Sequence, residues 1–266
     1  MFTLIQSLRA KFGQSVSRGK PNTAPLHLDL SKFDVIYAIG DVHGCLDLML
    51  SLETKIAKDI NNSHFDLPVI LYLGDLVDRG PKSAHILDHL TQRSTKVPRL
   101  SLRGNHEQLF MEFLQAPKNS LDWLDFGGAE TLNSYGIYKS RSFFEKASER
   151  DIMNLLFATI PDTHINFMNK MPHFADWDNK LFCHAGVDPT RPLSDQTAED
   201  YMWARDRFLA HDRGYERVIV HGHTPVTKPE IAFGRISIDT EAYKSGTLTS
   251  ARITATGEDI TFLSSN

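Results

Sequence analysis

Apolar and polar positions follow a regular order from residue 34 onward. Short β-branched apolar runs each lead, through a break that contains glycine, into a segment whose apolar residues recur at helical spacing. This order occurs in three pairs of segments: 34–41 with 46–60, 69–75 with 82–93, and 99–105 with 107–114. Strands that alternate with helices predict a sheet with helical connections, in which ligands bind beyond the carboxyl ends of the strands.

The second half of the chain has a different pattern. Residues 115–179 lack strand patterns, so we expect a helical insertion there, with a long helix over 142–160. The insertion is followed by mostly short predicted strands, at 180–186, 217–223, 235–239, 247–253 and 258–263. This β-rich part is expected to be antiparallel and to form a second sheet packed on the first. The predicted fold class is therefore α/β with two packed sheets.

The first 32 residues differ from the rest. They carry Arg9, Lys11, Arg18 and Lys20, with no acidic residue before Asp29. The apolar start is short and its positive charges follow the apolar residues, which does not fit a secretory signal. We expect a mobile basic tail over 1–32 and one domain over 33–266, with an amphipathic or organelle-targeting segment as the alternative for the tail.

Composition narrows the class of protein. Of 266 residues, 41% are hydrophobic and 23% are charged, which excludes collagen-like and disordered chains. No apolar run approaches the roughly 18 residues that a membrane span needs. A net charge of −4 offers no general attraction for nucleic acid. The two cysteines, Cys45 and Cys183, cannot form a disulfide framework, so a reducing, cytoplasmic location is expected.

Polar side chains concentrate where the predicted strands end. These ends are GDVHG (40–44), GDLVDRG (74–80), RGNHE (103–107), HAG (184–186) and HGHTP (221–225). They contain five of the chain's 12 histidines and seven of its 16 glycines, so both residue types gather where ligands are expected. Carboxylate, imidazole and amide groups are ligands that Mn, Fe or Zn accept. The sequence therefore predicts a metal site at these strand ends.

Spacing within the segments supports a metal site. Asp41 and His43 are two residues apart, so in an extended chain both point to one side, while Asp75 arrives from the neighbouring strand and could bridge two ions. Asn105 and His106 are adjacent, so one is expected to face the metals and the other the substrate. Each segment alone could instead close a turn or cap a helix, but that alternative does not explain all five together.

The same motifs carry a family resemblance. GDVHG, GDLVDRG, RGNHE, HAG and GHTP together resemble the signature of PPP-type phosphoprotein phosphatases, within the calcineurin-like metallophosphoesterases. The likeness to bacterial and bacteriophage-type members extends to RGNHEQL (103–109), WARDR (203–207) and SIDTEAY (237–243), and covers roughly residues 34–263. It implies two packed mixed sheets flanked by helices.

The resemblance also implies roles for individual residues. One divalent ion would be held by Asp41, His43 and Asp75, and a second by Asp75, Asn105, His184 and His223. Manganese is the expected metal, with iron and zinc as alternatives. His106 resembles the family's catalytic acid, paired with Asp78, and Arg79 and Arg205 resemble its phosphate-binding arginines. His221 is expected to support the site, and Glu241 stands where related sequences often have glycine.

The implied function is a metal-dependent phosphomonoesterase. It would hydrolyse phosphoserine and phosphothreonine, with phosphotyrosine as a further candidate, in phosphoproteins or phosphopeptides by direct attack of a metal-bridging hydroxide. Symmetrical dinucleoside tetraphosphatases and related pyrophosphatases are similar over GDVHGC and GDLVDRGP, but Asp78 and the GNHE segment favour the protein phosphatases. An inactive metal-binding interaction module is the alternative of another class. Such a module would be expected to have lost Asp75, Asn105, His106 or Arg79, and all four are present.

Overall fold

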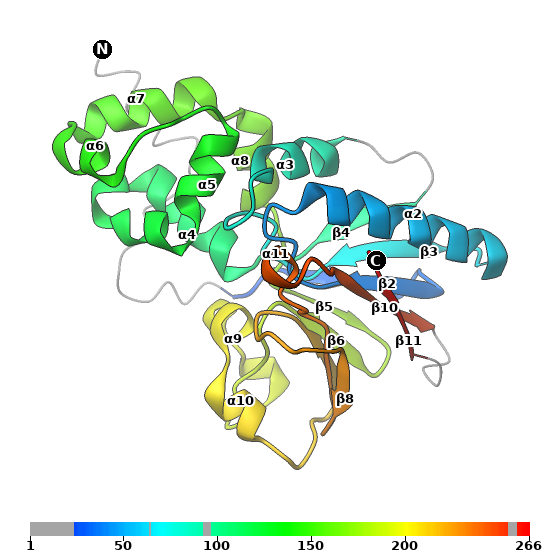
Figure 1. Ribbon diagram of the computed structural model, residues 1–266. Helices are drawn as coiled ribbons and strands as arrows, with labels where there is room; N and C mark the ends of the chain where they lie inside the picture. Colours follow the sequence, from blue (N-terminus) through cyan, green and yellow to red (C-terminus); the bar gives the residue numbers. More distant parts are fainter. Residues whose placement is uncertain (1–23, 64, 93–96, 255–259) are drawn as a thin grey trace.

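The computed structural model describes residues 24–63, 65–92, 97–254 and 260–266. Two sheets pack face to face and helices cover their outer faces (Figure 1). In the described residues the first sheet has the strand order β11-β10-β2-β3-β4 and the second the order β1-β5-β6-β7-β9-β8. Both sheets contain parallel and antiparallel pairs, which confirms the predicted α/β fold of two mixed sheets flanked by helices.

The first sheet is built on the βα pattern of the N-terminal half. β2 (Val35–Ile39), β3 (Pro68–Tyr72) and β4 (Arg99–Ser101) are parallel, and each is followed by a helix: α2 (Leu46–Ser63), α3 (Ser83–Thr91) and α4 (Asn105–Gln115). On β2, Tyr37 faces the helices, whereas Ala38 faces the second sheet. Both faces are therefore covered, which explains why the sequence of β2 is apolar throughout.

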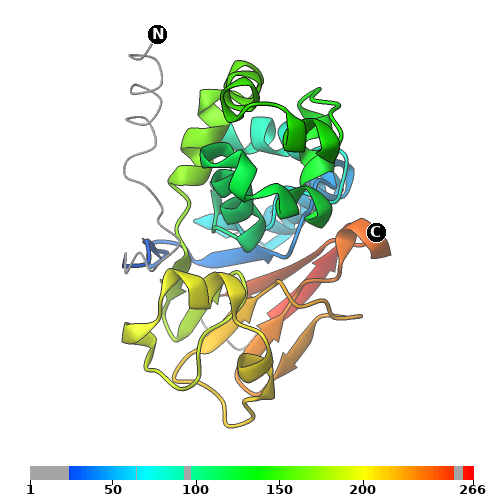
Figure 2. The ribbon, with the colours of Figure 1, turned by 90° about the vertical axis from the view of Figure 1, so that its left-hand side faces the viewer.

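The predicted insertion is helical up to residue 169. Its elements are η1 (Pro117–Asn119), η2 (Leu121–Phe126), α5 (Gly128–Ser134), α6 (Arg141–Lys146), α7 (Glu149–Thr159) and α8 (Asp162–Asn169). Figure 2 shows them grouped on the helical side of the first sheet, away from the second. The single helix expected over 142–160 is wrong, because the chain breaks at Ala147 and the Ser148 side chain accepts from the backbone N–H of Asp151 to begin α7.

β5 (Phe174–Trp177) lies inside the segment that was expected to be helical throughout. It pairs antiparallel with β6 (Lys180–Cys183), and Ala175 and Trp177 alternate into the core between the sheets. A strand this short has only two buried positions, so its period-two pattern is too brief to distinguish from a helix end.

The second sheet corrects the expected strand direction. β6, β7 (Val218–His221) and β9 (Arg235–Ser237) are parallel, although antiparallel strands were expected. The connection from β6 to β7 contains η3 (Leu193–Asp195), α9 (Ala198–Trp203) and α10 (Asp206–Ala210), and it is long enough for a parallel crossover. β8 (Glu230–Ala232) precedes β9 and pairs with it antiparallel.

The remaining strands complete the two sheets, and the strands expected at 247–253 and 258–263 belong to the first sheet, not to the second as expected. β10 (Thr249–Thr254) pairs antiparallel with β2 and with β11 (Ile260–Ser264), after the short helix α11 (Ala242–Ser245). β1 (His27–Asp29) pairs with β5 and Leu30 is buried, so ordered structure begins before the predicted boundary at residue 33. The predicted tail lies mostly outside the described residues and stays a prediction. No helix in the described ranges is long and apolar enough to span a bilayer.

Candidate metal centre

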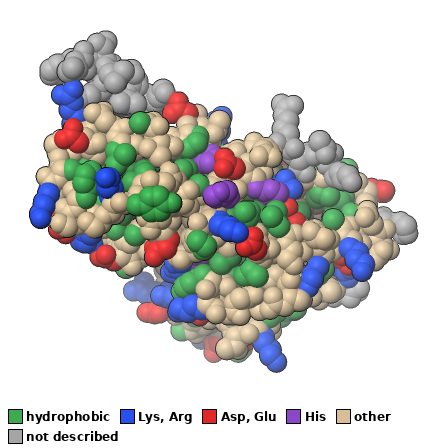
Figure 3. All heavy atoms as spheres, turned by 45° about the horizontal axis from the view of Figure 1, so that its top comes forward, with side chains coloured by type: hydrophobic (Ala, Val, Ile, Leu, Met, Phe, Trp, Pro, Cys, Tyr) green, Lys and Arg blue, Asp and Glu red, His purple; other side chains and the backbone are tan. Residues whose placement is uncertain are grey.

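The five polar segments meet where the ends of the two sheets come together. Asp41 and Asp75 follow β2 and β3, and Asn105 begins α4 after β4. His184 and His223 follow β6 and β7, and the backbone N–H of His223 donates to the Asp41 carboxylate at 3.1 Å, so the two sheets touch here. Histidine side chains reach the surface as a group, with charged side chains beside them (Figure 3).

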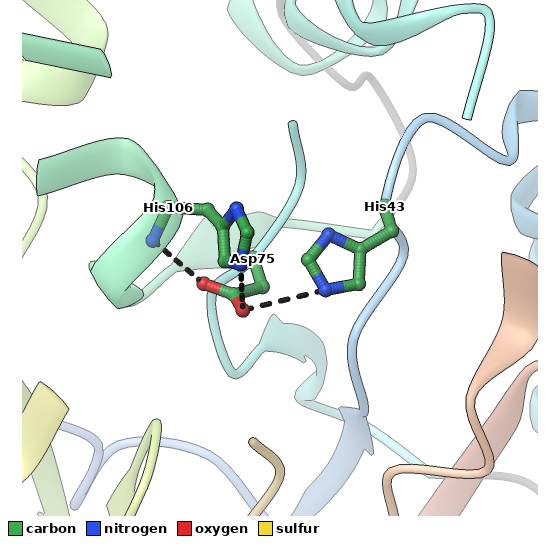
Figure 4. Close-up of side chains that lie close together, drawn as sticks. All are labelled: His43, Asp75 and His106. Carbon is green, nitrogen blue, oxygen red and sulfur yellow. Dashed lines mark hydrogen bonds and ion pairs between the residues drawn. The ribbon is translucent and has the colours of Figure 1, made fainter. Parts of the chain in front are cut away.

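Asp75 lies at the centre of the group. Its Oδ2 is 3.4 Å from His43 Nε2, and its Oδ1 is 3.3 Å from His184 Nε2. Figure 4 shows Asp75 between His43 and His106, with the backbone N–H of His106 donating to Oδ1 at 3.1 Å. Because the two carboxylate oxygens face different histidines, Asp75 is placed to bridge two ions.

The second histidine pair converges with an amide. Asn105 Oδ1 is 2.9 Å from His184 Nε2 and 3.0 Å from His223 Nδ1, and these two nitrogens are 3.2 Å apart. On the other side of Asp75, Asp41 Oδ2 is 3.9 Å from His43 Nε2. We call the six residues that were predicted as metal ligands, and that the structure brings together, the ligand cluster: Asp41, His43, Asp75, Asn105, His184 and His223.

Backbone carbonyls set the orientation of two imidazoles. His43 Nδ1 is 2.8 Å from Val77 O, and His184 Nδ1 is 3.1 Å from Leu73 O. Each Nδ1 must carry the proton to donate to a carbonyl, so each Nε2 is left with a lone pair that faces Asp75. Both rings thus present the tautomer that a metal ligand needs.

Burial controls the protonation of the cluster. It lowers the pKa of His43 to about 3 and, with the nearby His184, that of His223 to about 3, so both imidazoles are neutral at pH 7. Burial, and then repulsion from Asp239 and Asp75, raises the pKa of Asp41. Buried carboxylates that repel one another and neutral imidazoles beside them form a donor set that suits divalent cations.

His106 is set apart from the ligands by its partner. Its Nδ1 is 2.7 Å from Asp78 Oδ2, and that carboxylate also accepts from Trp123 Nε1 at 2.7 Å and from Thr131 Oγ1 at 2.6 Å. Burial would lower the pKa of His106, but Asp75 and Asp78 outweigh it and the pKa is raised. The protonated imidazole is therefore favoured, as a proton donor requires.

The family follows from comparison with known proteins. The calcineurin-like phosphoesterase model matches residues 35–248. This chain belongs to the calcineurin-like phosphoesterases. Members of the family use a dinuclear metal site, which agrees with the place of Asp75 between two groups of histidines.

Relatives of this phosphoesterase have more than one named activity. It is 28% identical over 232 residues to the asymmetrical bis(5'-nucleosyl)-tetraphosphatase PrpE of Bacillus subtilis, covering 80% of this chain and 88% of PrpE. It is 25% identical over 250 residues to serine/threonine-protein phosphatase 1 of Salmonella typhimurium, covering 88% and 99%. A solved structure named "putative diadenosine tetraphosphatase" has a TM-score of 0.60 at 17% identity, over 90% of this chain and 98% of the other.

The two predicted phosphate-binding arginines are placed differently. Arg79 Nη2 lies 3.2 Å from His106 Nε2, so this side chain enters the centre of the phosphoesterase. Arg205 is exposed and precedes α10, and its charge contributes to the low pKa of His223 after burial and His184. Within the described ranges its guanidinium makes no hydrogen bond to the ligand cluster.

Sequence reasoning missed Glu107, which orders the loops beneath the cluster. Its carboxylate accepts from the backbone N–H groups of Asp75, Leu76 and Gly104 at 2.9, 2.7 and 2.9 Å, and from that of Val77 at 3.2 Å. The available signal was a glutamate three residues after Gly104 at the start of a predicted helix, where its side chain can cap the N-terminus.

Other residues that shape the site were also not predicted from the sequence. Asp239, at the end of β9, is buried, and burial together with Asp75 raises its pKa to about 6. Trp123 and Thr131 come from the helical insertion and hold Asp78. His221, for which a supporting role was expected, is buried, with its Nε2 2.9 Å from Ser237 Oγ, and its role stays a prediction.

Strained backbone marks the same segments. A left-handed φ is found at His43, Asp75, Asp78, Arg79 and His223. Residues other than glycine rarely adopt this conformation, which costs roughly 1–3 kcal/mol per residue and persists only where surrounding contacts impose it. Here the strain turns the side chains toward one point.

Proposed function

We propose that this phosphoesterase hydrolyses phosphate monoesters of alcohols, namely phosphoserine and phosphothreonine in proteins or peptides. The observation that carries the proposal is the His106–Asp78 pair, in which a buried carboxylate favours the protonated imidazole. The alkoxide of a serine or threonine is a poor leaving group, so its departure needs a proton from a positioned acid. Phosphotyrosine has a better leaving group and is a further candidate substrate.

The ligand cluster is proposed to hold two divalent ions, manganese or alternatively iron or zinc. Asp41, His43 and Asp75 would hold one ion, and Asn105, His184 and His223 would hold the second with Asp75. When bound, such ions neutralise phosphoryl oxygens and lower the pKa of water. The donor atoms of Asp75, His184 and His223 converge, as do those of His43 and Asp75 together with His106, whereas the Asp41 carboxylate accepts from the His223 N–H and would turn toward the ion.

His106 and Arg79 are proposed to handle the proton and the phosphoryl charge. Asp78 occupies His106 Nδ1, so the proton for the leaving oxygen comes from Nε2. Arg79 Nη2 lies 3.2 Å from that nitrogen, so one substrate oxygen within hydrogen-bond distance of both groups would accept from both. The exposed Arg205 would approach the phosphoryl group from the His223 side.

A dinucleoside tetraphosphatase is the second candidate. The names of the Bacillus subtilis relative and of the structure with the TM-score of 0.60 favour it. Hydrolysis within a tetraphosphate breaks a P–O–P bond, and the nucleotide that departs leaves through a phosphate oxygen, which is a far better leaving group than an alkoxide. That reaction therefore depends less on a general acid, which is why the His106–Asp78 pair favours the monoester substrate.

The deciding experiment compares substrates. The full chain would be assayed with manganese, iron or zinc, and after chelation, on phosphoserine, phosphothreonine and phosphotyrosine peptides and on diadenosine tetraphosphate. We expect metal-dependent turnover of the phosphoserine and phosphothreonine peptides. The exposed His85 supplies a control, since His85→Asn should leave turnover unchanged.

Each of the other possible results would favour an alternative function. Turnover of the dinucleotide alone would overturn the proposal in favour of the tetraphosphatase. Metal binding without turnover of any of these substrates would favour an interaction module. A cytoplasmic location and the absence of a nucleic-acid partner stay predictions from composition.

A further inference from the structure

One of the two residues that flank the start of α11, Tyr243, contacts Arg79 from outside the ligand cluster, and the other, Glu241, contacts Tyr243. Arg79 Nη1 donates to Tyr243 Oη at 3.0 Å, and Arg79 Cζ lies 4.8 Å from the centre of the Tyr243 ring. Tyr243 Oη in turn lies 3.1 Å from Glu241 Oε1. We propose that Tyr243 is a positioning residue that holds Arg79 toward the phosphoryl group, and that Glu241 orients the hydroxyl of Tyr243.

The Tyr243 contact fixes the guanidinium in two ways. The hydrogen bond sets the position of one nitrogen, and the ring face attracts the delocalised charge. The opposite nitrogen, Nη2, is the one that lies beside His106 Nε2. A free arginine side chain has several rotatable bonds and loses conformational entropy when it is ordered. Contact with Tyr243 before substrate arrives removes part of that cost from phosphate binding.

Glu241 determines which way the hydroxyl points. A tyrosine hydroxyl has one hydrogen, and when it donates that hydrogen to Glu241 its lone pairs remain available to accept from Arg79. Lys244 also donates to Glu241, which keeps the carboxylate ionised by lowering its pKa together with the Tyr243 bond. The hydrogen bonds therefore run from Arg79 through Tyr243 to the Glu241 carboxylate, which also accepts from Lys244.

The segment that carries these residues is itself anchored to the centre. The backbone N–H of Glu241 donates to Asp239 Oδ1 at 2.8 Å, and Ala242 is buried. The Tyr243 ring also meets the His43 imidazole edge-on, with ring centres 5.4 Å apart. Tyr243 thus sits at a fixed place relative to a predicted metal ligand as well as to Arg79.

The main chain of Arg79 is fixed from the opposite side. Its N–H donates to Gly127 O at 3.3 Å. A Cβ added to Gly127 would lie 2.4 Å from that nitrogen, so this close approach requires glycine. With the backbone held by the insertion, the direction of the guanidinium depends on the contacts of its side chain, and Tyr243 supplies one of them.

The test uses the manganese-loaded full chain and p-nitrophenyl phosphate as a general monoester probe. For Tyr243→Phe we expect kcat/KM to fall about tenfold and inhibition by inorganic phosphate to weaken by a similar factor, because one hydrogen bond to a charged group is lost. Tyr243→Leu, which also removes the ring, should lose more, and Glu241→Gln less. Tyr138→Phe, at an exposed tyrosine, is the matched control and should match the unmodified chain.

Coupling to Arg79 separates positioning from simple packing. In an Arg79→Ala background, Tyr243→Phe should cause no further loss, since the group that it positions is gone. A tenfold loss in both backgrounds, or an unchanged kcat/KM in Tyr243→Phe, would overturn the proposal. The inference rests on the proposed function only through the role of Arg79. A chain that hydrolyses the probe but no phosphopeptide would refute the proposed substrate and leave this inference open to the same test.

Discussion

The two sheets contribute to the ligand cluster from opposite sides and hold their side chains differently. On the first sheet, the segments after β3 and β4 are joined by Glu107, and Asp78 is held by two residues of the insertion. On the second sheet, His223 is only partly buried, and its ring lies 6.3 Å from that of Trp203, which is 42% exposed. The side that the first sheet supplies is closed and joined by hydrogen bonds, whereas the other side is open at His223 and Arg205, although His184 is fully buried there.

This difference in burial indicates that the two sides have different roles in the proposed reaction. A buried segment that hydrogen bonds hold in place keeps its geometry without a ligand. The side with His43, Asp75 and His106 can therefore orient the proposed attack of hydroxide on the phosphoryl group and the proposed proton transfer from His106. The side with His223 and Arg205 is more accessible, and side chains there can adjust as substrate enters and product leaves. We therefore expect the ion held by Asp41, His43 and Asp75 to bind more tightly than the ion that also needs His223.

The largest expected effect tests the proton donor on the closed side. His106→Asn should lower turnover of an alkyl phosphate by about 10²–10⁴-fold, because the alkoxide then leaves without a proton. Turnover of an activated aryl phosphate should fall much less, since its leaving group needs no proton. Steady-state kinetics on the two substrates measures the ratio.

Equal losses on the two substrates would contradict the role of His106 as the acid. Asp78→Asn supplies a second measurement, because it retains the shape of the partner but no longer favours the charged imidazole. We expect the same preference for the activated substrate, with a smaller loss than in His106→Asn.

The next largest expected effect concerns the Glu107 hydrogen bonds that join the segments after β3 and β4. Glu107→Gln replaces one of two oxygens that accept backbone hydrogen bonds with an NH2 group that cannot accept them, at a fully buried position. We expect the free energy of unfolding to fall by about 3 kcal/mol, measured by urea titration. Glu112→Gln, on the same helix but partly exposed, should change it by less than about 0.5 kcal/mol. Similar losses in both variants would argue against a special role of Glu107 in joining the segments.

The closed side was also the more predictable one from sequence. Asp41, Asp75 and Asn105 each stand two to four residues after a strand in a clear βα pattern, so their meeting follows from the parallel order of β2, β3 and β4. The resemblance to a known family added the pairing of His106 with Asp78, which the structure places 2.7 Å apart.

The open side depends on contacts that no local pattern encodes. The parallel direction of β6, β7 and β9 follows from the crossover through α9 and α10, whose short helices give little periodic signal. Tyr243 meets Arg79 across 164 positions of sequence, and Trp123 meets Asp78 across 45. These long-range contacts depend on how the insertion and α11 pack around the centre, so they cannot be predicted from the local sequence.

A smaller effect separates the two metal positions. In a calorimetric titration of the chelated chain with manganese, we expect two binding phases, and His223→Asn should weaken only the weaker phase by about 10–100-fold. His43→Asn, the matched variant on the closed side, should weaken the tighter phase. Loss of the tighter phase in His223→Asn would contradict the expectation that the ion on the closed side binds more tightly.

The smallest expected effect concerns the outer edge of the second sheet, where His173 joins the chain before β1 to the chain before β5. The ring Nδ1 of His173 accepts from the backbone N–H of Leu26 at 2.9 Å, and the backbone N–H of His173 donates to the backbone carbonyl of Leu26 at 2.9 Å. Burial, and then the charge of Arg103, lowers the pKa of His173 from its ordinary value of 6.5 to about 4. The unfolded chain therefore takes up a proton at a pH where the folded chain resists it, so stability is lost as pH falls from 6.5 toward 4.

The expected size of this loss is about 1–2 kcal/mol between pH 7 and pH 5. His173→Asn retains an acceptor near the position of Nδ1 and has no titrating group, so its free energy of unfolding should fall less over the same interval. Urea titrations of both chains at several pH values give the difference. Parallel pH profiles would show that His173 does not weaken the edge of the second sheet in acid, and the contrast between the sheets would then be confined to the ligand cluster.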